Sequence, residues 1–385
     1  MNTAVDACMA HAFAGCARVT AAARALEVKE LSKLRDLLRR WDLGRVVTCM
    51  VLAGVVTGCQ SPESMSLMEA TDSMSELADA RTLFGGTWKL VRVERYDQTG
   101  EPLPDFVHQE IGQAGALGYL MYDGERMAAV VQQDERAGSA SDVLTPEEAL
   151  AAVESYTAYF GSYSVDTADG YVVNQVLGSL NPRGAGGDTQ PFYEFAANQL
   201  VLTPSLQCPD SFLTDRGCGY GTTGIQLRNV WEKVEPATAS DIDSRFLGFW
   251  QIDRVERRTS DGREVPTPQY EQGYLIYMPS GHMMVHLIRP GRTFYEEARP
   301  TATEAAVAMQ SYVSYVGSFT VDGNAAVVVH RRDGDLNPNM VGDEAFRTFE
   351  FRNDQLILKP PAANVDGQVL QRVLYWNRLS ALDSR

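Results

Sequence analysis

One stretch of sequence occurs twice, and this repeat constrains the fold more than any other feature. The first copy begins at Ser155 and reads SYTAYFGSYSVD, and the second begins at Ser311 and reads SYVSYVGSFTVD. A Leu-Asn-Pro turn follows each copy, starting at Leu180 and at Leu336. Both features recur after the same 156 positions (311 − 155 and 336 − 180). The chain therefore holds one domain in duplicate.

Length and charge bound the class of protein. At 385 residues the chain is long enough for two domains, each with a core of its own. Its 44% hydrophobic and 22% charged residues are globular values, which excludes a disordered or fibrous chain. The formal net charge of -16 repels phosphate backbones, so we expect no nucleic-acid partner.

The N-terminal segment has the order of a secretory signal. An apolar run over residues 46–58 follows a basic segment and ends in small residues. The run is too short to span a bilayer, and the alternative is a buried helix of the first domain. Its end, Val56-Thr57-Gly58-Cys59, resembles the lipobox of bacterial lipoproteins. That resemblance implies a lipid anchor on Cys59 and, with Gln60 next, an outer-membrane protein facing the periplasm.

The segments follow from these signals. We expect a leader and signal peptide over 1–58, a tether over 59–82, one domain over 83–235, a linker over 236–245 and a second domain over 246–385. The long stretch before the apolar run suggests a true translation start near residues 31–45. Cys208 and Cys218 lie in a Pro/Gly-rich segment, which suits a disulfide outside the cytoplasm; two free thiols are the alternative.

Both domains read as short strands with one helix midway. Trp88, Leu90, Arg92 and Glu94 share the face of a predicted strand. Asp123-Gly124 and Ser280-Gly281 predict hairpin turns. This alternation of strands and turns predicts an all-β fold, two tandem up-and-down barrels with one α-helix inserted in each. Closure would leave no sheet edge exposed.

The helices are predicted from their first residues. Thr145-x-x-Glu148 and Thr301-x-x-Glu304 are capping boxes, with Pro146 at the first helical position. We expect the first helix to run over 145–160, with Leu150, Val153, Thr157 and Phe160 on one face. The second helix is expected to match it and to carry Tyr312 and Tyr315 as neighbours.

Each half resembles the lipocalin-like domain found in bacterial and fungal proteins. The resemblance rests on four motifs: Gly-x-Trp, Gly-Tyr-Leu-x-Tyr, Leu-Asn-Pro, and a closing Trp followed two residues later by a base. In the first half they begin, in this order, at Gly86, Gly118, Leu180 and Trp231. In the second half they begin at Gly248, Gly273, Leu336 and Trp376. It implies a calyx-shaped barrel with a cavity for a small, mostly apolar ligand. A barrel of this kind does not specify which ligand.

The family pattern also has a His before the Asn-Pro turn and an Arg after it. The second domain keeps both, as His330 and Arg347, whereas the first has Asn174 and Pro191. The second domain is therefore the better candidate for a polar site.

Strand alternation places His330 with Val328 and Arg347 with Phe349 and Phe351. If these faces point inward, the two polar groups need a partner or an anionic ligand. A ligand carboxylate on Arg347 would satisfy that; the alternative is an ion pair with Glu256 or another strand carboxylate that only closes the barrel. The predicted ligand-binding residues are His330, Arg347, Tyr274, Tyr277, Tyr312, Tyr315, Phe349 and Phe351. The tyrosines suit an aromatic pocket wall, or equally a packed helix.

Other chemistry is not indicated. His282 and His286 share a strand face, but that spacing puts them roughly 13 Å apart, too far for one metal ion. We find no phosphate loop, no hydrolase motif and no zinc spacing, so no metal, cofactor or catalytic residue is predicted. Arg378 is expected to stack on Trp376 at the closed end of the barrel.

Three functions stay open. The first is a lipid-anchored envelope protein that binds a small hydrophobic or amphipathic ligand. The second is an isomerase- or cyclase-type enzyme in which His330, Arg347 and the tyrosines orient a ligand and move a proton. The third is a scaffold with two solid barrels and an exposed apolar patch.

Overall fold

The computed structural model describes residues 80–97, 101–103, 116–134, 136–139, 141, 143–204, 226–238, 242–365 and 367–379. Cys59, Cys208 and Cys218 lie outside the described residues, so lipidation and the disulfide stay predictions. No helix in the described ranges combines the length and the apolar character that crossing a bilayer requires.

Barrel 1 is a closed antiparallel sheet. Its neighbour order is β4-β3-β2-β1-β9-β8-β7-β5, the β4–β5 pairing closes the ring, and the short β6 pairs with β5. The bounds are β1 (Gly86–Tyr96), β2 (Leu117–Tyr122), β3 (Arg126–Gln132), α5 (Pro146–Glu154), β4 (Tyr156–Asp166), β5 (Tyr171–Ser179), β6 (Asp188–Thr189), β7 (Phe192–Ala196), β8 (Gln199–Thr203) and β9 (Gln226–Val234).

Barrel 2 repeats this order. Its neighbours run β10-β12-β13-β14-β15-β16-β17-β19, the β10–β19 pairing closes the ring, and β11 and β18 extend its rim. The bounds are β10 (Gly248–Thr259), β11 (Glu264–Val265), β12 (Gln272–Tyr277), β13 (His282–Ile288), α7 (Ala302–Ser311), β14 (Tyr312–Asp322), β15 (Val327–Asp335), β16 (Glu344–Arg352), β17 (Gln355–Lys359), β18 (Ala363–Val365) and β19 (Gln368–Arg378).

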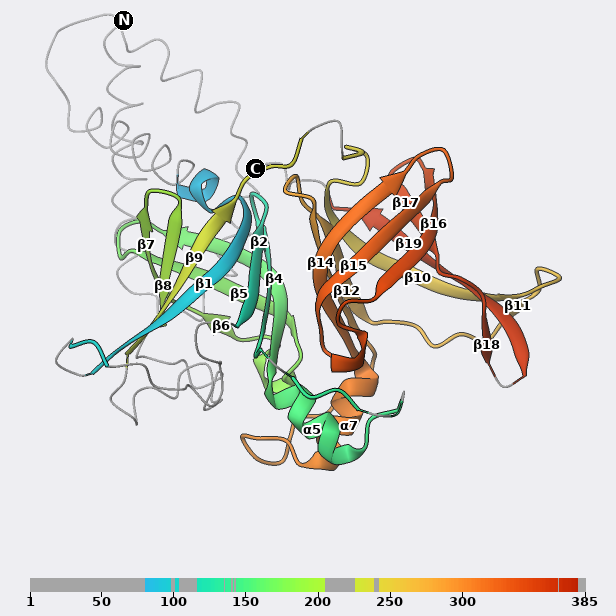
Figure 1. Cartoon of the computed structure of the whole chain (residues 1–385), viewed down its shortest axis with the longest axis horizontal. Coiled ribbons are helices and arrows are strands. Elements are labelled where there is room, and N and C mark those ends of the chain that lie inside the picture. The colour runs from blue at the N-terminus through green and yellow to red at the C-terminus, as the bar shows by residue number, and fades with distance from the viewer. Residues whose placement is uncertain are drawn as a thin grey trace, which may run out of the picture. The chain divides into compact units, whose positions relative to one another are not determined.

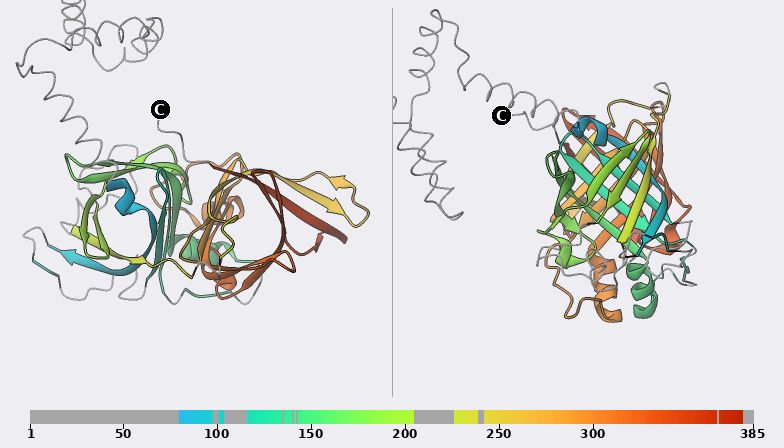
Figure 2. Two further views of the ribbon diagram at one scale, coloured as in Figure 1. Left: turned by 90° about the horizontal axis from the view of Figure 1, so that it is seen from above. Right: turned by 90° about the vertical axis from the view of Figure 1, so that its left-hand side faces the viewer.

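The predicted fold class is confirmed. Within the described residues the chain forms two closed eight-stranded barrels, each with one helix between its third and fourth barrel strands (Figure 1). The view from above shows both sheets as closed rings (Figure 2). The predicted hairpins are also present, since β2 pairs with β3 across Asp123-Gly124 and β12 with β13 across Ser280-Gly281.

The helices begin where predicted but end earlier. The capping boxes are formed, with Glu148 and Glu304 each accepting from the backbone N–H of its capping threonine at 2.7 Å. α5 stops at Glu154, so the prediction of a helix to residue 160 is wrong. The segment that follows is aromatic and β-branched, a composition that favours a strand, and burial alternates along β4. Tyr312 and Tyr315 accordingly lie on β14, not on a helix.

A β-bulge corrects the predicted face of the first strand. The register of β1 against β9 shifts between Leu90 and Arg92. The extra residue shifts the alternation by one, so Trp88 and Leu90 are buried whereas Arg92 is exposed. The prediction that Arg92 shares their strand face is therefore wrong. β10 has the same shift between Ile252 and Arg254.

A tryptophan and a cation close one end of each barrel. The Arg378 guanidinium lies 4.1 Å from the ring centroid of Trp250, its cross-strand partner, rather than on Trp376 as predicted. The Trp250 ring N–H donates to the Phe246 carbonyl at 2.7 Å. Barrel 1 builds the same end with Lys233 over Trp88, at 5.1 Å. The stack is therefore a structural element of both copies.

Candidate ligand site in barrel 2

Barrel 2 contains a partly open cavity of about 300 Å³. One part of its wall is aliphatic, formed by Leu275, Val285, Leu287, Leu358 and Leu374. The other part is polar or charged and is formed by His330, Arg332, Asp335, Arg347 and Arg372. An apolar wall with a few converging polar groups is the usual composition of a small-molecule site.

His330 is held between two tyrosines. The Tyr277 hydroxyl lies 2.7 Å from Nε2, and the Tyr315 hydroxyl lies 2.9 Å from Nδ1. Burial, and then the charges of Arg347 and Arg332, hold the pKa of His330 well below its ordinary value. The ring is therefore neutral and donates to one tyrosine while it accepts from the other. This chain fixes the imidazole rather than leaving it free to bind a metal ion.

Three guanidinium groups reach the same cavity. Arg332 is paired with Asp335 at 3.1 Å. Arg372 has no carboxylate among the charges that act on it; burial lowers its pKa first, and Arg347 lowers it further. Arg347 donates to the backbone carbonyl of Phe346 at 3.1 Å. In the described part of the chain, neither Arg347 nor Arg372 forms an ion pair.

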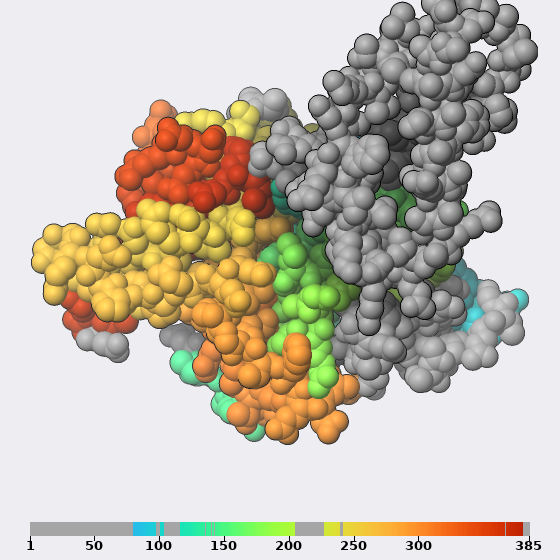
Figure 3. Space-filling view, turned by 180° about the vertical axis from the view of Figure 1, so that it is seen from behind, coloured from blue at the N-terminus to red at the C-terminus, as the bar shows by residue number. Residues whose placement is uncertain are grey.

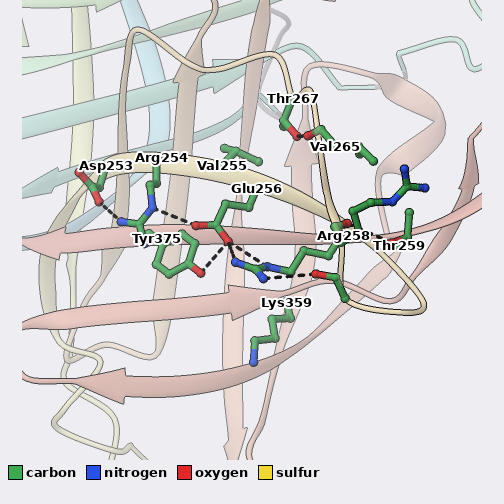
Figure 4. Close-up of polar contacts among 12 residues, drawn as sticks. Asp253, Arg254, Val255, Glu256, Arg258, Thr259, Val265, Thr267, Lys359 and Tyr375 are labelled. Carbon is green, nitrogen blue, oxygen red and sulfur yellow. Dashed lines mark hydrogen bonds and ion pairs between the residues drawn. The ribbon is translucent and has the colours of Figure 1, made fainter.

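Glu256 is not the partner of Arg347. It accepts from Arg254 at 3.1 Å, from Arg258 at 2.6 Å and from the Tyr375 hydroxyl at 3.0 Å (Figure 4). This network lies on the outer face, because Tyr375 alternates with the inward Trp376 and Glu256 is in register with Val373. The alternative in which Glu256 neutralises the barrel interior is therefore wrong.

Among the described residues, Asp335 is the single carboxylate that lines the cavity. Burial raises its pKa to about 7, against the lowering effects of Arg332 and of a hydrogen bond from the backbone N–H of Asn337. Even when ionised, it balances only Arg332. The cavity therefore carries a net positive charge.

The predicted site residues divide into three groups. Four of them, His330, Arg347, Tyr312 and Tyr315, line the cavity together. Three more lie in the barrel interior without lining the cavity. Tyr277 forms a hydrogen bond with His330. Phe349 and Phe351 pack on Phe246, with ring centroids 4.9 and 5.1 Å away. Tyr274 lies outside the barrel interior, 4.7 Å from Phe160 of barrel 1.

Sequence reasoning missed Arg332, Arg372 and Asp335. The signal was available in the comparison of the two halves. At the 156-residue spacing Arg332 corresponds to Val176, and when the closing tryptophans are aligned Arg372 corresponds to Leu227. Together with Asn174 and Pro191, these residues replace every cationic or imidazole group of the barrel 2 cavity. Asn174 is buried and donates to Thr189 at 3.0 Å.

The other two histidines in the described ranges, His282 and His286, make separate contacts. His286 is fully buried, with Nδ1 3.0 Å from the Tyr312 hydroxyl, and burial lowers its pKa to about 3. His282 contacts Ser280 instead. Across the described ranges no cluster of three or more potential metal ligands is found.

Comparison with family models identifies the domain. A family model described as a lipocalin-like domain matches residues 85–216 and again 247–379. No curated protein matches the sequence significantly. One similar solved structure is a DUF3598-family protein of unknown function from Nostoc punctiforme (11% identity over 79% of this chain and 99% of that chain, TM-score 0.20).

Two further structures were found. They are an uncharacterized protein from Saccharomyces cerevisiae (12% identity, 76% of this chain and 98% of that chain, TM-score 0.33) and a mutant of the vaccine antigen transferrin binding protein B from Haemophilus parasuis (7% identity, 77% and 76%, TM-score 0.17). At these scores none of the three informs the function.

Proposed function

Because the chain belongs to the lipocalin-like domain family, with one family domain in each half, we propose that barrel 2 binds a small amphipathic anion. The observation that carries the proposal is the pair Arg347 and Arg372, two cations that reach one cavity without a carboxylate partner. Both side chains are half-buried, and a cation that is partly removed from water is costly unless a counter-charge compensates it. A ligand carboxylate supplies that charge, and its apolar body packs on the leucine wall.

The cavity volume limits the size of the ligand. At the roughly 30 Å³ that a water molecule occupies in the liquid, 300 Å³ holds about ten non-hydrogen atoms. A medium-chain carboxylate such as octanoate has this size. The proposal therefore predicts that the carboxylate, rather than the chain alone, determines affinity.

The test is a calorimetric titration with octanoate and with 1-octanol. We expect octanoate to bind and octanol to bind at least tenfold more weakly. Arg347→Gln should weaken octanoate by about 10- to 100-fold, since a hydrogen bond to a charged group contributes about 1.5–3 kcal/mol. Arg331→Gln is the matched control, because Arg331 is on the same sheet and exposed. Equal affinity for the acid and the alcohol would refute the proposal.

The second part of the proposal concerns location. The lipobox-like segment ending at Cys59 supports a protein that is lipid-anchored in the bacterial envelope, at the outer membrane. Expression in a bacterium with an alkyne-labelled fatty acid tests this. Label should enter the wild type and not Cys59→Ser, which should leave the membrane fraction. An unlabelled, uncleaved wild type in the cytosol would exclude the anchor.

One observation favours an enzyme of the isomerase or cyclase type. The Tyr277–His330–Tyr315 chain connects the cavity to a buried imidazole and is able to move a proton. Incubation of 4-oxooctanoate with the protein in D₂O distinguishes binding from catalysis. An enzyme would incorporate deuterium at the carbons next to the ketone faster than buffer alone, and His330→Gln would abolish this acceleration. Uptake at the buffer rate would leave the binding function.

A further inference from the structure

The two barrels meet through reciprocal arginines. Arg136 of barrel 1 donates to the backbone carbonyls of Asp335 and Leu336 in barrel 2, the latter at 2.7 Å. Arg292 of barrel 2 donates to the carbonyls of Ser179, at 2.6 Å, and Leu180 in barrel 1. Figure 3 shows the orange segment that carries Arg292 against the light green segment of barrel 1. Donors and acceptors are each 156 positions apart, the spacing of the repeat.

The surroundings of the two arginines repeat as well. Arg136 lies over the ring of Tyr156 at 5.0 Å, and Arg292 lies over the ring of Tyr312 at 5.2 Å. The Tyr156 hydroxyl then reaches Ser314 across the interface at 3.1 Å, and the Tyr312 hydroxyl donates back to the Ala158 carbonyl at 3.5 Å. These contacts again exchange equivalent positions of the two halves.

Two equivalent glycines allow the barrels to approach. A Cβ added to Gly178 would clash with Ile288 of barrel 2. A Cβ added to Gly334 would lie 2.7 Å from Leu117 of barrel 1. Around them, one apolar cluster contains buried residues of both barrels, among them Phe160 and Ile276. The interface is therefore packed like a protein interior and not only hydrogen-bonded.

This reciprocity is the defining property of an isologous interface, in which residue i contacts j and the equivalent of j contacts the equivalent of i. Several residues that agree between the halves, such as Tyr156 with Tyr312 and Arg136 with Arg292, make the reciprocal contacts of this interface. The four cationic or imidazole positions of the barrel 2 cavity, by contrast, are not shared with barrel 1. The repeat therefore preserves the docking contacts but not the polar groups of the cavity.

We propose that barrel 1 occupies the place of a second copy of barrel 2. The face of barrel 2 that carries Arg292, Tyr312 and Leu336 is self-complementary, and the partner that it fits is another copy of the same domain. Barrel 1 is then a covalently attached docking subunit for the one barrel with a cationic cavity. This proposal does not depend on the identity, or on the existence, of the ligand.

The experiment uses the full chain with a protease site inserted in the linker over residues 236–245. The folded protein is cut, incubated to allow exchange and analysed by native mass spectrometry. We expect the two halves to stay together at first as a pair of barrel 1 with barrel 2 (1+2), and pairs of barrel 2 with barrel 2 (2+2) to form as the halves exchange. Two 1+2 pairs give one 2+2 pair and release two copies of barrel 1, so dilution before incubation should increase the share of 2+2 pairs. Only 1+2 pairs, or separate folded halves, would overturn the proposal.

Arg292→Gln provides the specific control. Its contact occurs once in a 1+2 pair and twice in a 2+2 pair. A tenfold weakening of the first should therefore appear as about a hundredfold weakening of the second. Arg331→Gln, an exposed arginine of the same barrel, should change neither. Equal weakening of both pairs by Arg292→Gln would contradict the proposed symmetry.

A second measurement on the uncut chain decides the question if the separated halves precipitate. Because the two arginines make equivalent contacts, Arg136→Gln and Arg292→Gln should lower Tm by similar amounts. A loss confined to one of the two variants would show that the interface is not reciprocal and would overturn the proposal.

Discussion

Arg372 should be a residue that lowers the stability of the empty protein. Its cross-strand partner on β10 is another cation, Arg257, and Arg347 reaches the same cavity. The equivalent position of barrel 1 holds Leu227, which is almost fully buried. Arg372→Leu therefore introduces a residue that this fold already accepts at that place, while it removes a cation without a carboxylate partner.

The magnitude follows from the like charges. Like charges directly opposite on neighbouring strands destabilise a sheet by up to about 1 kcal/mol. Replacement of a buried charge by an apolar side chain is often neutral or stabilising in other proteins as well. We therefore expect Arg372→Leu to stabilise the ligand-free protein by about 1 kcal/mol. For a domain of this size that raises Tm by roughly 2–4 °C.

Differential scanning calorimetry without ligand measures this shift, and the octanoate titration measures the opposite effect on affinity. Tm should rise while octanoate binding weakens by about 10- to 100-fold. Arg331→Leu, which changes an exposed arginine, should alter neither. A fall in Tm of several degrees for Arg372→Leu would refute the reasoning, because Arg372 would then be held by a structural contact.

Three further outcomes are expected. Arg378→Ala should lower Tm more than Lys233→Ala, because the guanidinium stacks at 4.1 Å and bonds two carbonyls, whereas the ammonium stacks at 5.1 Å and bonds one; equal losses in thermal melts would contradict this. Thr301→Ala should cost about 1 kcal/mol in urea unfolding through the lost helix cap, and no change would refute the cap. Asp335 has a folded pKa raised to about 7, against about 3.9 unfolded, so its protonated form contributes stability below pH 4 that is lost between pH 4 and 7. From pH 5 to 7 the free energy of unfolding of the wild type should therefore fall by about 2 kcal/mol relative to that of Asp335→Asn. If urea unfolding gave the two proteins the same change in this free energy over that pH range, the titration of Asp335 would be excluded.

The repeat, the turns and the helix caps were sufficient to predict two barrels with inserted helices. Each of these signals is local: Asp123-Gly124 requires a hairpin, and Thr145 with Glu148 requires a helix start. The end of the helix was not predicted, because the apolar spacing from Leu150 to Phe160 fits a helix nearly as well as a strand. Tertiary pairing of β4 with β3 and β5 decides that choice, and a single sequence window does not contain it.

The candidate site was predicted in part. His330 and Arg347 were identified because they match a family pattern, and both line the cavity. Arg372 was missed because it lies on the last strand, far in sequence from the other two. Tyr274 was placed in the pocket because aromatic residues suit either a cavity or a core. Which face of its strand meets the other barrel is a property of the assembled pair, which periodicity does not reveal.

The bulge in β10 also decides which charges enter barrel 2. Without the extra residue, Arg254, Glu256 and Arg258 would continue the inward row begun by Trp250 and Ile252. The Glu256 carboxylate would then face the cavity arginines and would compete with the carboxylate of a ligand. One inserted residue thus directs the Glu256 ion pairs to the outer face of the barrel. The arginines of the cavity are left without the negative charge of Glu256.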